Sequence, residues 1–484
     1  MASVKQLAGQ TALYGLPSIL GRLLNFLLVP IHTHVMSKSE FGIVTDLYVW
    51  VAVLIVLLTY GMETAFFFHA GKGESDRVFR TGMLSLLLTT LLFYAFFEWQ
   101  LESISLWMRY TDHPEYLRYM AWILCLDVLA ALPFARLRLE GRAVRFVFVK
   151  MSLIAVNIAT NLFFFLYVVP SQEDLQLWGL SLTLPNVEYV LLANLFASSV
   201  MFILLFPQWR SVFRWGDWDK QLWRRMLVYG LPLMVAGLAG IANELADRQF
   251  LKYLLPQELA MAEVGVYGAI YKLSIFLVLF VQAYRYAAEP FFFRMQVADQ
   301  REMNARVLRY YTLMLGAVVI ALNAGIPVIK HFIDEKFWTG LYIAPVLFAA
   351  NFILGLNTHL GIWYKLADRT SFALLITFAG LFVTIALNFW LIPHMGILGS
   401  AWATLASYTC MAVLNAFLGR KYAPMPYAWK VLLSYFFSSL LLGFFAWRVQ
   451  TDWGLWSVLC ILPYGLLAVI LERESWVKWR MSRS

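Results

Sequence analysis

Long apolar stretches separated by short polar segments recur along the whole chain. A hydrocarbon core of about 30 Å is crossed by a helix of about 20 apolar residues. Most of the stretches have about this length. The pattern therefore predicts an all-α, polytopic membrane protein of about fourteen transmembrane helices, at residues 11–35, 42–69, 79–99, 116–139, 146–169, 187–207, 225–251, 264–290, 307–332, 341–364, 370–393, 397–418, 429–448 and 454–471.

The distribution of Lys and Arg between these stretches supports the helix count. With the N-terminus in the cytoplasm, 27 of the 38 basic residues fall in inside loops and tails, seven in outside loops and four within helices. Cytoplasmic loops carry such an excess of positive charge. A wrong count would reverse the alternation after the error, but the alternation holds to the end. We therefore expect a multi-pass protein of a bacterial inner membrane with both termini in the cytoplasm.

Composition excludes several other classes. The chain is 61% hydrophobic and 14% charged, whereas soluble globular proteins carry about 25% charged residues. The hydrophobic excess runs from Leu13 to Leu471, which argues against a separate soluble domain. The net charge of +9 follows the inside loops and does not indicate nucleic acid as a partner. The first stretch, with Arg22 in its middle, exceeds the length of a signal h-region, so we expect it to be a retained helix.

The order of short matches along the chain indicates an internal duplication. The tetrapeptide at 14–17, Tyr-Gly-Leu-Pro, recurs at 229–232. Further matches keep the same order: Glu40–Gly42 with Glu263–Gly265, Glu63–Phe68 with Glu289–Phe293, and Asn161–Pro170 with Asn388–Pro393. We expect two six-helix bundles at 1–210 and 211–420, related by a pseudo-twofold axis along the membrane normal. Helices 13 and 14 with a basic tail, residues 421–484, fall outside the repeat.

At these residues the chain resembles the polysaccharide exporters of the multidrug/oligosaccharidyl-lipid/polysaccharide exporter superfamily. The likeness lies in the opening at 7–22, in Tyr286–Phe291 and in Asn388–Thr404. The resemblance implies a V-shaped pair of bundles and a flippase for O-antigen or capsule repeat units on undecaprenyl pyrophosphate. It also implies contacts with membrane lipids and with other polysaccharide-assembly proteins. A sibling, the lipid II flippase, carries an Arg-Ser-Gly-Asp-like stretch in helix 1, whereas here Arg22 is followed by Leu23 and Leu24.

Cations inside the predicted spans are the candidate substrate-binding groups. An ionisable side chain near the bilayer centre costs at least about 2.5–3.5 kcal/mol, so it indicates function by default. Arginine offers a fixed charge and two-pronged geometry for a phosphate, and nearby amides suit sugar hydroxyls. The predicted substrate-binding set is Arg22, Asn25, Asn243, Arg248, Lys272 and Arg285.

Acids in the same helices are candidates for coupling to a proton or sodium gradient. They are Asp46, Glu63, Asp127, Glu244, Asp247 and Glu289. A second interpretation stays open for some of them. Glu244 with Arg248, and Arg285 with Glu289, have the i,i+4 spacing of simple helix pairs, and Asp127 suits a structural hydrogen-bonded acid. The sequence shows no metal-ligand spacing, and we expect no catalytic residue and no cofactor.

Four functions remain to be separated. The first is translocation of undecaprenyl-pyrophosphate-linked oligosaccharide from the inner to the outer leaflet by alternating access. A lipid II flippase and a cation-coupled multidrug antiporter are alternatives of the same class, but four intramembrane cations count against an antiporter. A glycan polymerase or ligase needs a large outer loop with catalytic carboxylates or histidines, and the outside loops are short. We therefore predict a transporter and not an enzyme.

Overall fold

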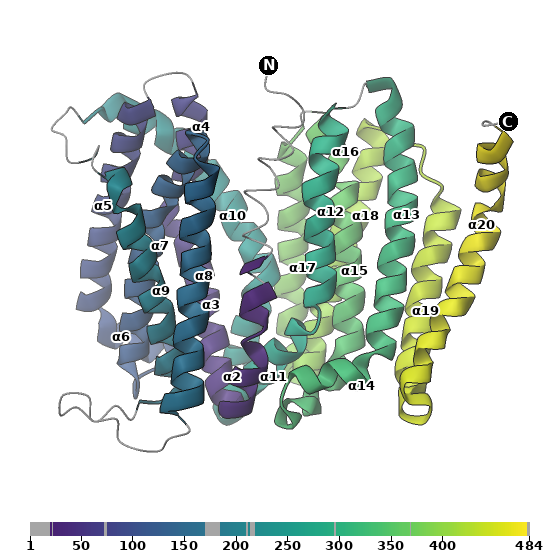
Figure 1. The fold of residues 1–484 in the computed structure, drawn as a ribbon, viewed down its shortest axis with the longest axis horizontal. Helices are drawn as coiled ribbons and strands as arrows, with labels where there is room; N and C mark the ends of the chain where they lie inside the picture. The colour runs from purple at the N-terminus through teal and green to yellow at the C-terminus, as the bar shows by residue number, and fades with distance from the viewer. Residues whose placement is uncertain are drawn as a thin grey trace. The chain divides into compact units, whose positions relative to one another are not determined.

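The computed structural model describes residues 20–21, 23–71, 75–169, 184–209, 212, 218–294, 297–367 and 369–481. Within these ranges the regular elements are all helices (Figure 1). Twelve helices are long and apolar enough to cross a membrane, and a bent pair at 257–272 and 275–288 adds one more. The shorter apolar helix Leu23–Val35 corresponds to the described part of the first predicted span. The all-α membrane fold is confirmed, and about fourteen helices is consistent with it.

The described part of the chain divides into two compact units, residues 1–245 and 246–484. The boundary falls inside one long helix, α10, because its two ends pack in different units. The predicted three-part division at 210 and 420 rests on the internal repeat and stays a prediction. The helices up to this boundary are α2 (Val29–Val35), α3 (Lys38–Thr59), α4 (Met62–Ala70), α5 (Ser75–Trp99), α6 (Leu101–Met108), α7 (Pro114–Leu139), α8 (Ala143–Phe163), α9 (Asn186–Trp209) and α10 (Lys220–Leu254).

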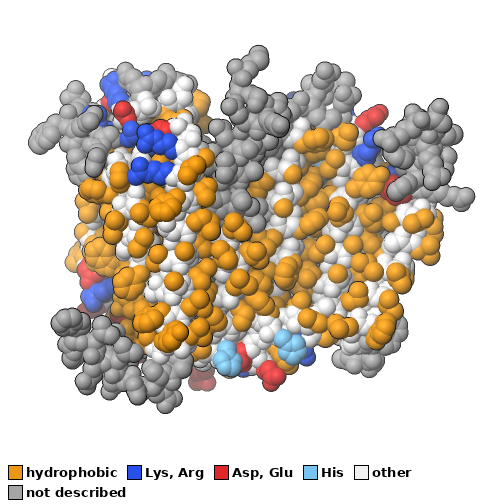
Figure 2. Space-filling view, in the orientation of Figure 1, with side chains coloured by type: hydrophobic (Ala, Val, Ile, Leu, Met, Phe, Trp, Pro, Cys, Tyr) orange, Lys and Arg blue, Asp and Glu red, His pale blue; other side chains and the backbone are white. Residues whose placement is uncertain are grey.

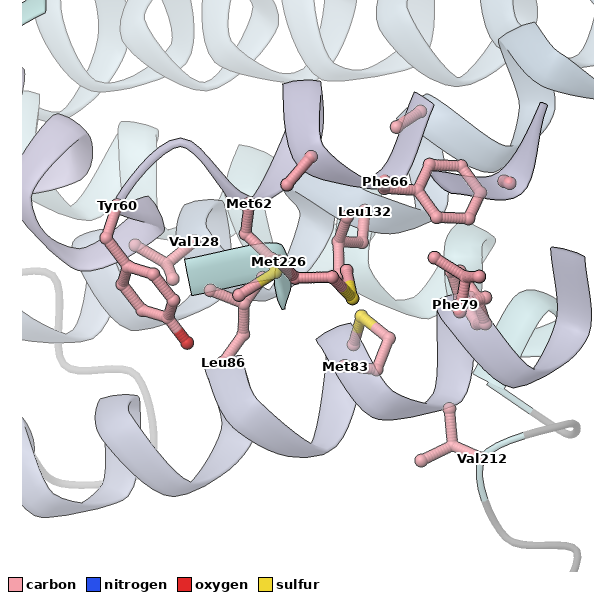
Figure 3. Packing of buried hydrophobic residues seen from close by; sticks show 14 of the residues in the cluster. Tyr60, Met62, Phe66, Phe79, Met83, Leu86, Val128, Leu132, Val212 and Met226 are labelled. Carbon is pink, nitrogen blue, oxygen red and sulfur yellow. The ribbon is translucent and has the colours of Figure 1, made fainter. Parts of the chain in front are cut away.

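In the first unit, α7 is the central helix. It packs against α3, α4, α5, α8 and α9, and 67% of its most apolar window is buried, against 17% for α8. A hydrophobic core forms where α4, α5 and α7 meet the start of α10, with Met62, Phe79, Met83, Leu132 and Met226 at its centre (Figure 3). This core fixes the N-terminal part of α10 in the first unit.

The outer surface of the first unit has a polarity that suits a membrane. Hydrophobic side chains cover the length of its helices, and Lys and Arg side chains gather at the end where α8 begins (Figure 2). Arg142 and Arg145 lie there, beside the exposed apolar side chains of Val144 and Phe148. This cluster of Lys and Arg side chains agrees with the positive charge predicted for the loop between the fourth and fifth spans.

The second unit repeats the packing pattern of the first. Its central helix is α15 (Ala344–Leu360), within a span whose most apolar window is 61% buried. It packs against α13 and α18, just as α7 packs against α5 and α9 six spans earlier. This repetition supports the duplication expected from the sequence. The other elements are α11 (Gln257–Lys272), α12 (Ile275–Arg294), α13 (Val297–Ala324), α14 (Ile326–Ile329), α16 (Ile362–Leu366), α17 (Ser371–Met395), α18 (Ile397–Tyr422), α19 (Trp429–Trp453), α20 (Ile461–Met481) and three 3₁₀ helices (Lys330–Phe332, Glu335–Ile343 and Gly454–Cys460).

The second helix of each half is interrupted within the described residues. In the first half α3 ends at Tyr60 and Gly61, which have φ angles of 34° and 72°. In the second half α11 and α12 meet at a 52° bend. By contrast, α10 stays helical through Pro232. Helices 2 and 8, which are equivalent in the two halves, are thus both broken, whereas helix 7 is continuous at its proline.

Candidate substrate and coupling site

Arg248 forms the best-defined polar contact among the predicted site residues. It lies on α10, and its Nη1 is 2.7 Å from Asp247 Oδ1. Both side chains are buried, with exposed fractions of 5% and 3%. The guanidinium also lies over two tyrosine rings of α11, 4.4 Å from the centre of Tyr271 and 5.4 Å from that of Tyr267. Aromatic faces attract cations, so α11 supplies a second source of stabilisation for Arg248.

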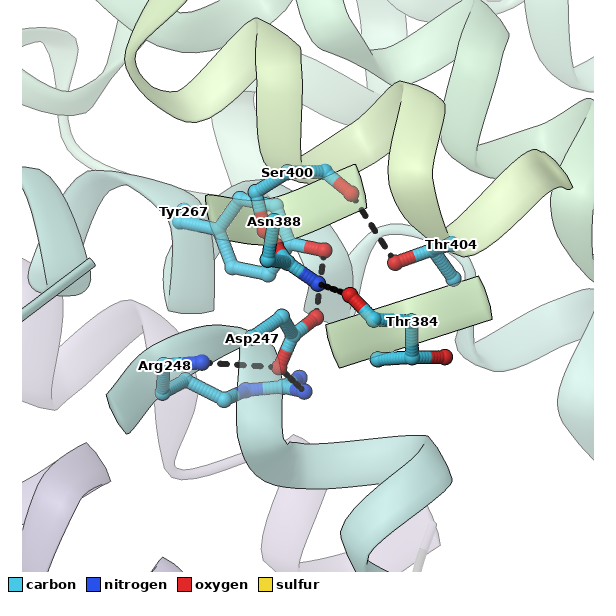
Figure 4. Close-up of polar contacts among 7 residues, drawn as sticks. All are labelled: Asp247, Arg248, Tyr267, Thr384, Asn388, Ser400 and Thr404. Carbon is cyan, nitrogen blue, oxygen red and sulfur yellow. Dashed lines mark hydrogen bonds and ion pairs between the residues drawn. The ribbon is translucent and has the colours of Figure 1, made fainter. Parts of the chain in front are cut away.

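Oxygen atoms from three further helices surround Asp247 (Figure 4). The hydroxyl of Tyr267 donates to Asp247 Oδ2 at 2.6 Å. Asn388 of α17 donates to the carbonyl of Thr384, which leaves its buried Oδ1 without a hydrogen-bond partner. Ser400 Oγ of α18 is likewise buried without a partner. Carboxylate, amide and hydroxyl oxygens from four helices therefore gather at one place in the second unit.

Lys272 adds a second cation to this region. It ends α11 directly after Tyr271, and its charge lies within coulombic range of Arg248. Its side chain is exposed, and among the described side chains it has no ion-pair partner within 4.0 Å. Asp247, Arg248 and Lys272 together carry one net positive charge. The region is therefore suited to an anion.

The structure describes three of the four remaining predicted substrate residues. Arg22 lies outside the described residues. Asn25 is exposed in the helix before α2, and Asn243 is buried on α10, one turn before Asp247. Arg285 is exposed on α12, with its guanidinium 5.8 Å from the ring of Tyr286. Lys272 directly follows the tyrosine whose ring lies under the Arg248 guanidinium, and the substrate-binding roles of all six residues stay predictions.

The acids of the first unit each have a defined partner. Asp46 is buried and accepts a hydrogen bond from Tyr110 at 2.6 Å. Glu63 forms an ion pair with Arg138. Asp127 accepts a hydrogen bond from Ser198 at 2.8 Å. Each of the three acids therefore has at least one partner in the first unit, and their coupling role stays a prediction.

Two acids of the second half are described less fully. Glu244 is exposed on α10. The backbone of Glu289 lies in α12, but its side chain is outside the described part of the chain. Among the residues that the structure describes, no three His, Cys, Asp or Glu side chains form a metal site.

Solved structures with a similar fold include several that are described as membrane transporters. A structure described as the lipid II flippase MurJ in an inward closed conformation has 13% identity and a TM-score of 0.72, covering 96% of this chain and 99% of that chain. An inward-facing multidrug MATE transporter of the MOP superfamily has 14% identity and a TM-score of 0.63, covering 85% and 94%. A MOP transporter from Pyrococcus furiosus has 14% identity and a TM-score of 0.60, covering 86% and 95%. No curated protein matches the sequence.

A sequence comparison decides the family. Residues 7–296, more than half of the chain, match the family described as polysaccharide biosynthesis protein. The chain belongs to this family. The matched range covers nearly all of the first unit together with the rest of α10, α11 and α12, so it includes Arg248 and Lys272. The resemblance noted in the sequence is confirmed, and the structural matches place this family member in the fold class of the MOP superfamily.

Sequence reasoning missed several groups around the site of this polysaccharide biosynthesis protein. Tyr267 and Tyr271 carry no signal in an apolar, aromatic-rich stretch. Asn388 could have been found from the sequence, because an amide in an apolar span indicates a polar partner. From the sequence alone, we used this residue only as part of the internal repeat. Lys150 of α8 lies 4.2 Å from the ring centre of Phe134, inside a span, whereas the loop count had placed it outside the helices.

Proposed function

We propose that this protein is a flippase for undecaprenyl-pyrophosphate-linked oligosaccharide, which it moves from the inner to the outer leaflet of the bacterial inner membrane. Family membership supports polysaccharide biosynthesis as the process. The shared fold with MOP transporters supports alternating access as the mode of transport. Both termini lie in the cytoplasm in this proposal, as the positive-inside pattern predicts.

The observation that carries the proposal is the exposed, unneutralised Lys272 beside Arg248 within a span. Two cations in coulombic range repel one another, and each is costly to hold in an apolar span. A bound diphosphate would remove both penalties, because its charge neutralises Lys272 and its oxygens match the two-pronged guanidinium of Arg248. An organic cation would add to the repulsion, which argues against a multidrug antiporter.

Asp247 is the proposed coupling acid. In the structure it holds Arg248, so the guanidinium is shared between the carboxylate and any incoming anion. A proton or sodium ion on Asp247 would neutralise the carboxylate and weaken this pair. Arg248 would then be available to the diphosphate. Loading of the coupling site and binding of the substrate would favour one another, as linkage requires.

Reconstitution tests the proposal. Purified protein in liposomes should carry a fluorescent polyprenyl-pyrophosphate sugar between leaflets, measured by its protection from an impermeant quencher, while protein-free liposomes do not. Equal transport of lipid II would assign the protein to peptidoglycan synthesis instead. Release of phosphate or elongation of the glycan in place of transport would favour an enzyme, and the proposal would then be wrong.

A further inference from the structure

A basic pocket of about 430 Å³ lies in the first unit. It forms where α4 ends and α10 begins, and it is lined by Phe68, His69, Arg224, Arg225, Val228 and Tyr229. Its volume falls in the range of about 300–1,000 Å³ that small-molecule sites occupy. None of these residues belongs to the predicted substrate or coupling sets.

Aromatic rings build one wall of this pocket. Phe68 and Tyr229 stack with their ring centres 4.4 Å apart and their planes 13° from parallel. The ring of His69 meets both rings edge-on, at 5.1 Å from Phe68 and 6.2 Å from Tyr229. Phe68 and Tyr229 are nevertheless 42% and 36% exposed. The wall is thus held in place by packing, and it still offers ring surface to a ligand.

Two arginines supply the charge. Arg224 and Arg225 are both exposed, and within the described part of the chain neither forms an ion pair or a hydrogen bond. The nearest acid in sequence, Asp219, is engaged elsewhere: it accepts from the backbone of Leu222 and pairs with Arg77 at 2.9 Å. Arg225 interacts with Asp219 only through long-range electrostatics, so its charge is not neutralised by a direct ion pair. Adjacent guanidinium groups with unused donors are suited to phosphate oxygens.

The pocket is anchored to the crossing of two helices. Tyr229 directly precedes Gly230, whose backbone touches Tyr60 and Gly61 at the break between α3 and α4. The aromatic and basic walls therefore come from two segments that are fixed together. Both segments lie at the ends of their spans that carry the excess of basic residues, which is the cytoplasmic side in the proposed orientation.

We propose that this pocket is the entry site for the diphosphate of the lipid-linked glycan at the inner leaflet. Arg224 and Arg225 bind the diphosphate oxygens, and the exposed face of the Phe68–Tyr229 stack packs against the first sugar. This inference rests on the proposed flippase function and adds to it a first binding station distinct from Arg248 and Lys272. An anionic phospholipid presents a single phosphodiester with no sugar ring attached, so it is the competitor to be excluded.

Binding of farnesyl diphosphate to the detergent-solubilised full-length protein tests the entry site. The test variant is R224Q/R225Q. The matched control is R142Q/R145Q, which removes the same charge from a second pocket of about 610 Å³ at the start of α8. Both variants are made in a K272Q background, because Arg248 and Lys272 are themselves proposed to bind a diphosphate. We expect the test variant to bind at least about tenfold more weakly than this parent, which corresponds to about 1.4 kcal/mol, and the control to stay within about twofold of it. Equal losses in both variants, or no loss in either, would overturn the proposal.

A second variant and a competitor separate the remaining outcomes. Y229L keeps both arginines, so it should bind farnesyl diphosphate as wild type does but lose the preference for a sugar-bearing diphosphate. This result stays informative if R224Q/R225Q does not fold. Phosphatidylglycerol in mixed micelles should not displace the probe; equal displacement would assign the pocket to phospholipid. Transport by the wild-type protein is measured separately. Intact transport by R224Q/R225Q would contradict the entry site alone. If the wild-type protein binds the probe but transports no lipid-linked glycan, the proposed flippase function is wrong.

Discussion

Gly230 of α10 crosses Gly61 so closely that neither position has room for a side chain. A Cβ atom on Gly230 would lie 2.6 Å from the carbonyl oxygen of Tyr60, and one on Gly61 would lie closer still to the carbonyl of Gly230. Gly61 also has a φ of 72°, which a side chain disfavours. The second copy of the Tyr-Gly-Leu-Pro motif, at 229–232, therefore has a structural role. Its glycine lets helix 7 pack directly against the break in helix 2.

Substitution at this crossing should destabilise the protein. We expect G230A to lose about 1–3 kcal/mol, because the added methyl group meets backbone that cannot rotate away. The matched control is G240A on the same helix, where a Cβ would meet nothing within 4 Å. The measurement is the melting temperature of each purified variant in one detergent. Equal melting temperatures for G230A and G240A would show that the crossing is not tight.

Neutralising Lys272 should reduce transport more than it reduces stability. We expect K272Q to lower the initial rate of leaflet transfer by about tenfold, the effect of losing about 1.4 kcal/mol of anion binding. K272R should retain most of the rate, since the charge is kept. K430Q is the control, because Lys430 is also exposed but lies at the start of α19. A wild-type rate in K272Q would remove Lys272 from the binding site.

Asp247 should control the response to an ion gradient. In D247N the amide cannot be loaded with a proton or form an ion pair with Arg248, so we expect transport that no longer accelerates when a proton or sodium gradient is imposed. D127N is the comparison, because Asp127 is held by Ser198 and is expected to be structural. The measurement is the ratio of rates with and without each gradient. If D127N loses the response and D247N keeps it, the coupling acid is Asp127.

The stability of the fold should depend on pH through Asp219, at the start of α10. Hydrogen bonds from the backbone of Leu222 and Gln221, together with the charge of Arg77, hold the pKa of Asp219 below its usual value. A carboxyl whose pKa is lowered by folding stabilises the fold above its unfolded pKa of about 3.9, and this stabilisation is lost as the pH falls through the folded value.

D219N tests this dependence, because it keeps the cap on α10 but removes the charge. We expect it to melt below wild type at pH 6 and to approach wild type as the pH is lowered toward 3. A constant difference across that range would show that the charge of Asp219 contributes nothing. D76N is a suitable control, because Asp76 also pairs with an arginine, Arg136, but caps no part of α10.

Span positions were accessible from sequence because burial in lipid requires long apolar stretches, which composition reveals directly. The packing inside each unit was only partly accessible. The equivalence of α7 and α15 follows from the repeat, but the breaks at Gly61 and at the α11–α12 bend do not. Both lie within apolar stretches, where hydropathy stays high whether or not the helix is continuous.

The candidate site shows the same limit. Arg248 and Lys272 stand out in the sequence because charge in a span is costly, and in the structure Lys272 directly follows Tyr271, whose ring contacts the Arg248 guanidinium. The ion pair of Arg248 with Asp247 was not predicted, because adjacent residues point to different sides of an ideal helix. Arg224 and Arg225 were counted only as inside charges, since nothing in the sequence shows that Phe68 lies beside Tyr229.

Transfer of one oligosaccharide on two different lipid anchors tests the central claim most directly. The two substrates would carry the same fluorescent glycan, one on a polyprenyl diphosphate and the other on an uncharged polyprenyl ether. If cations at Arg248 and Lys272 select the diphosphate, reconstituted protein should transfer the first at least about tenfold faster. Equal rates for the two anchors would contradict the account.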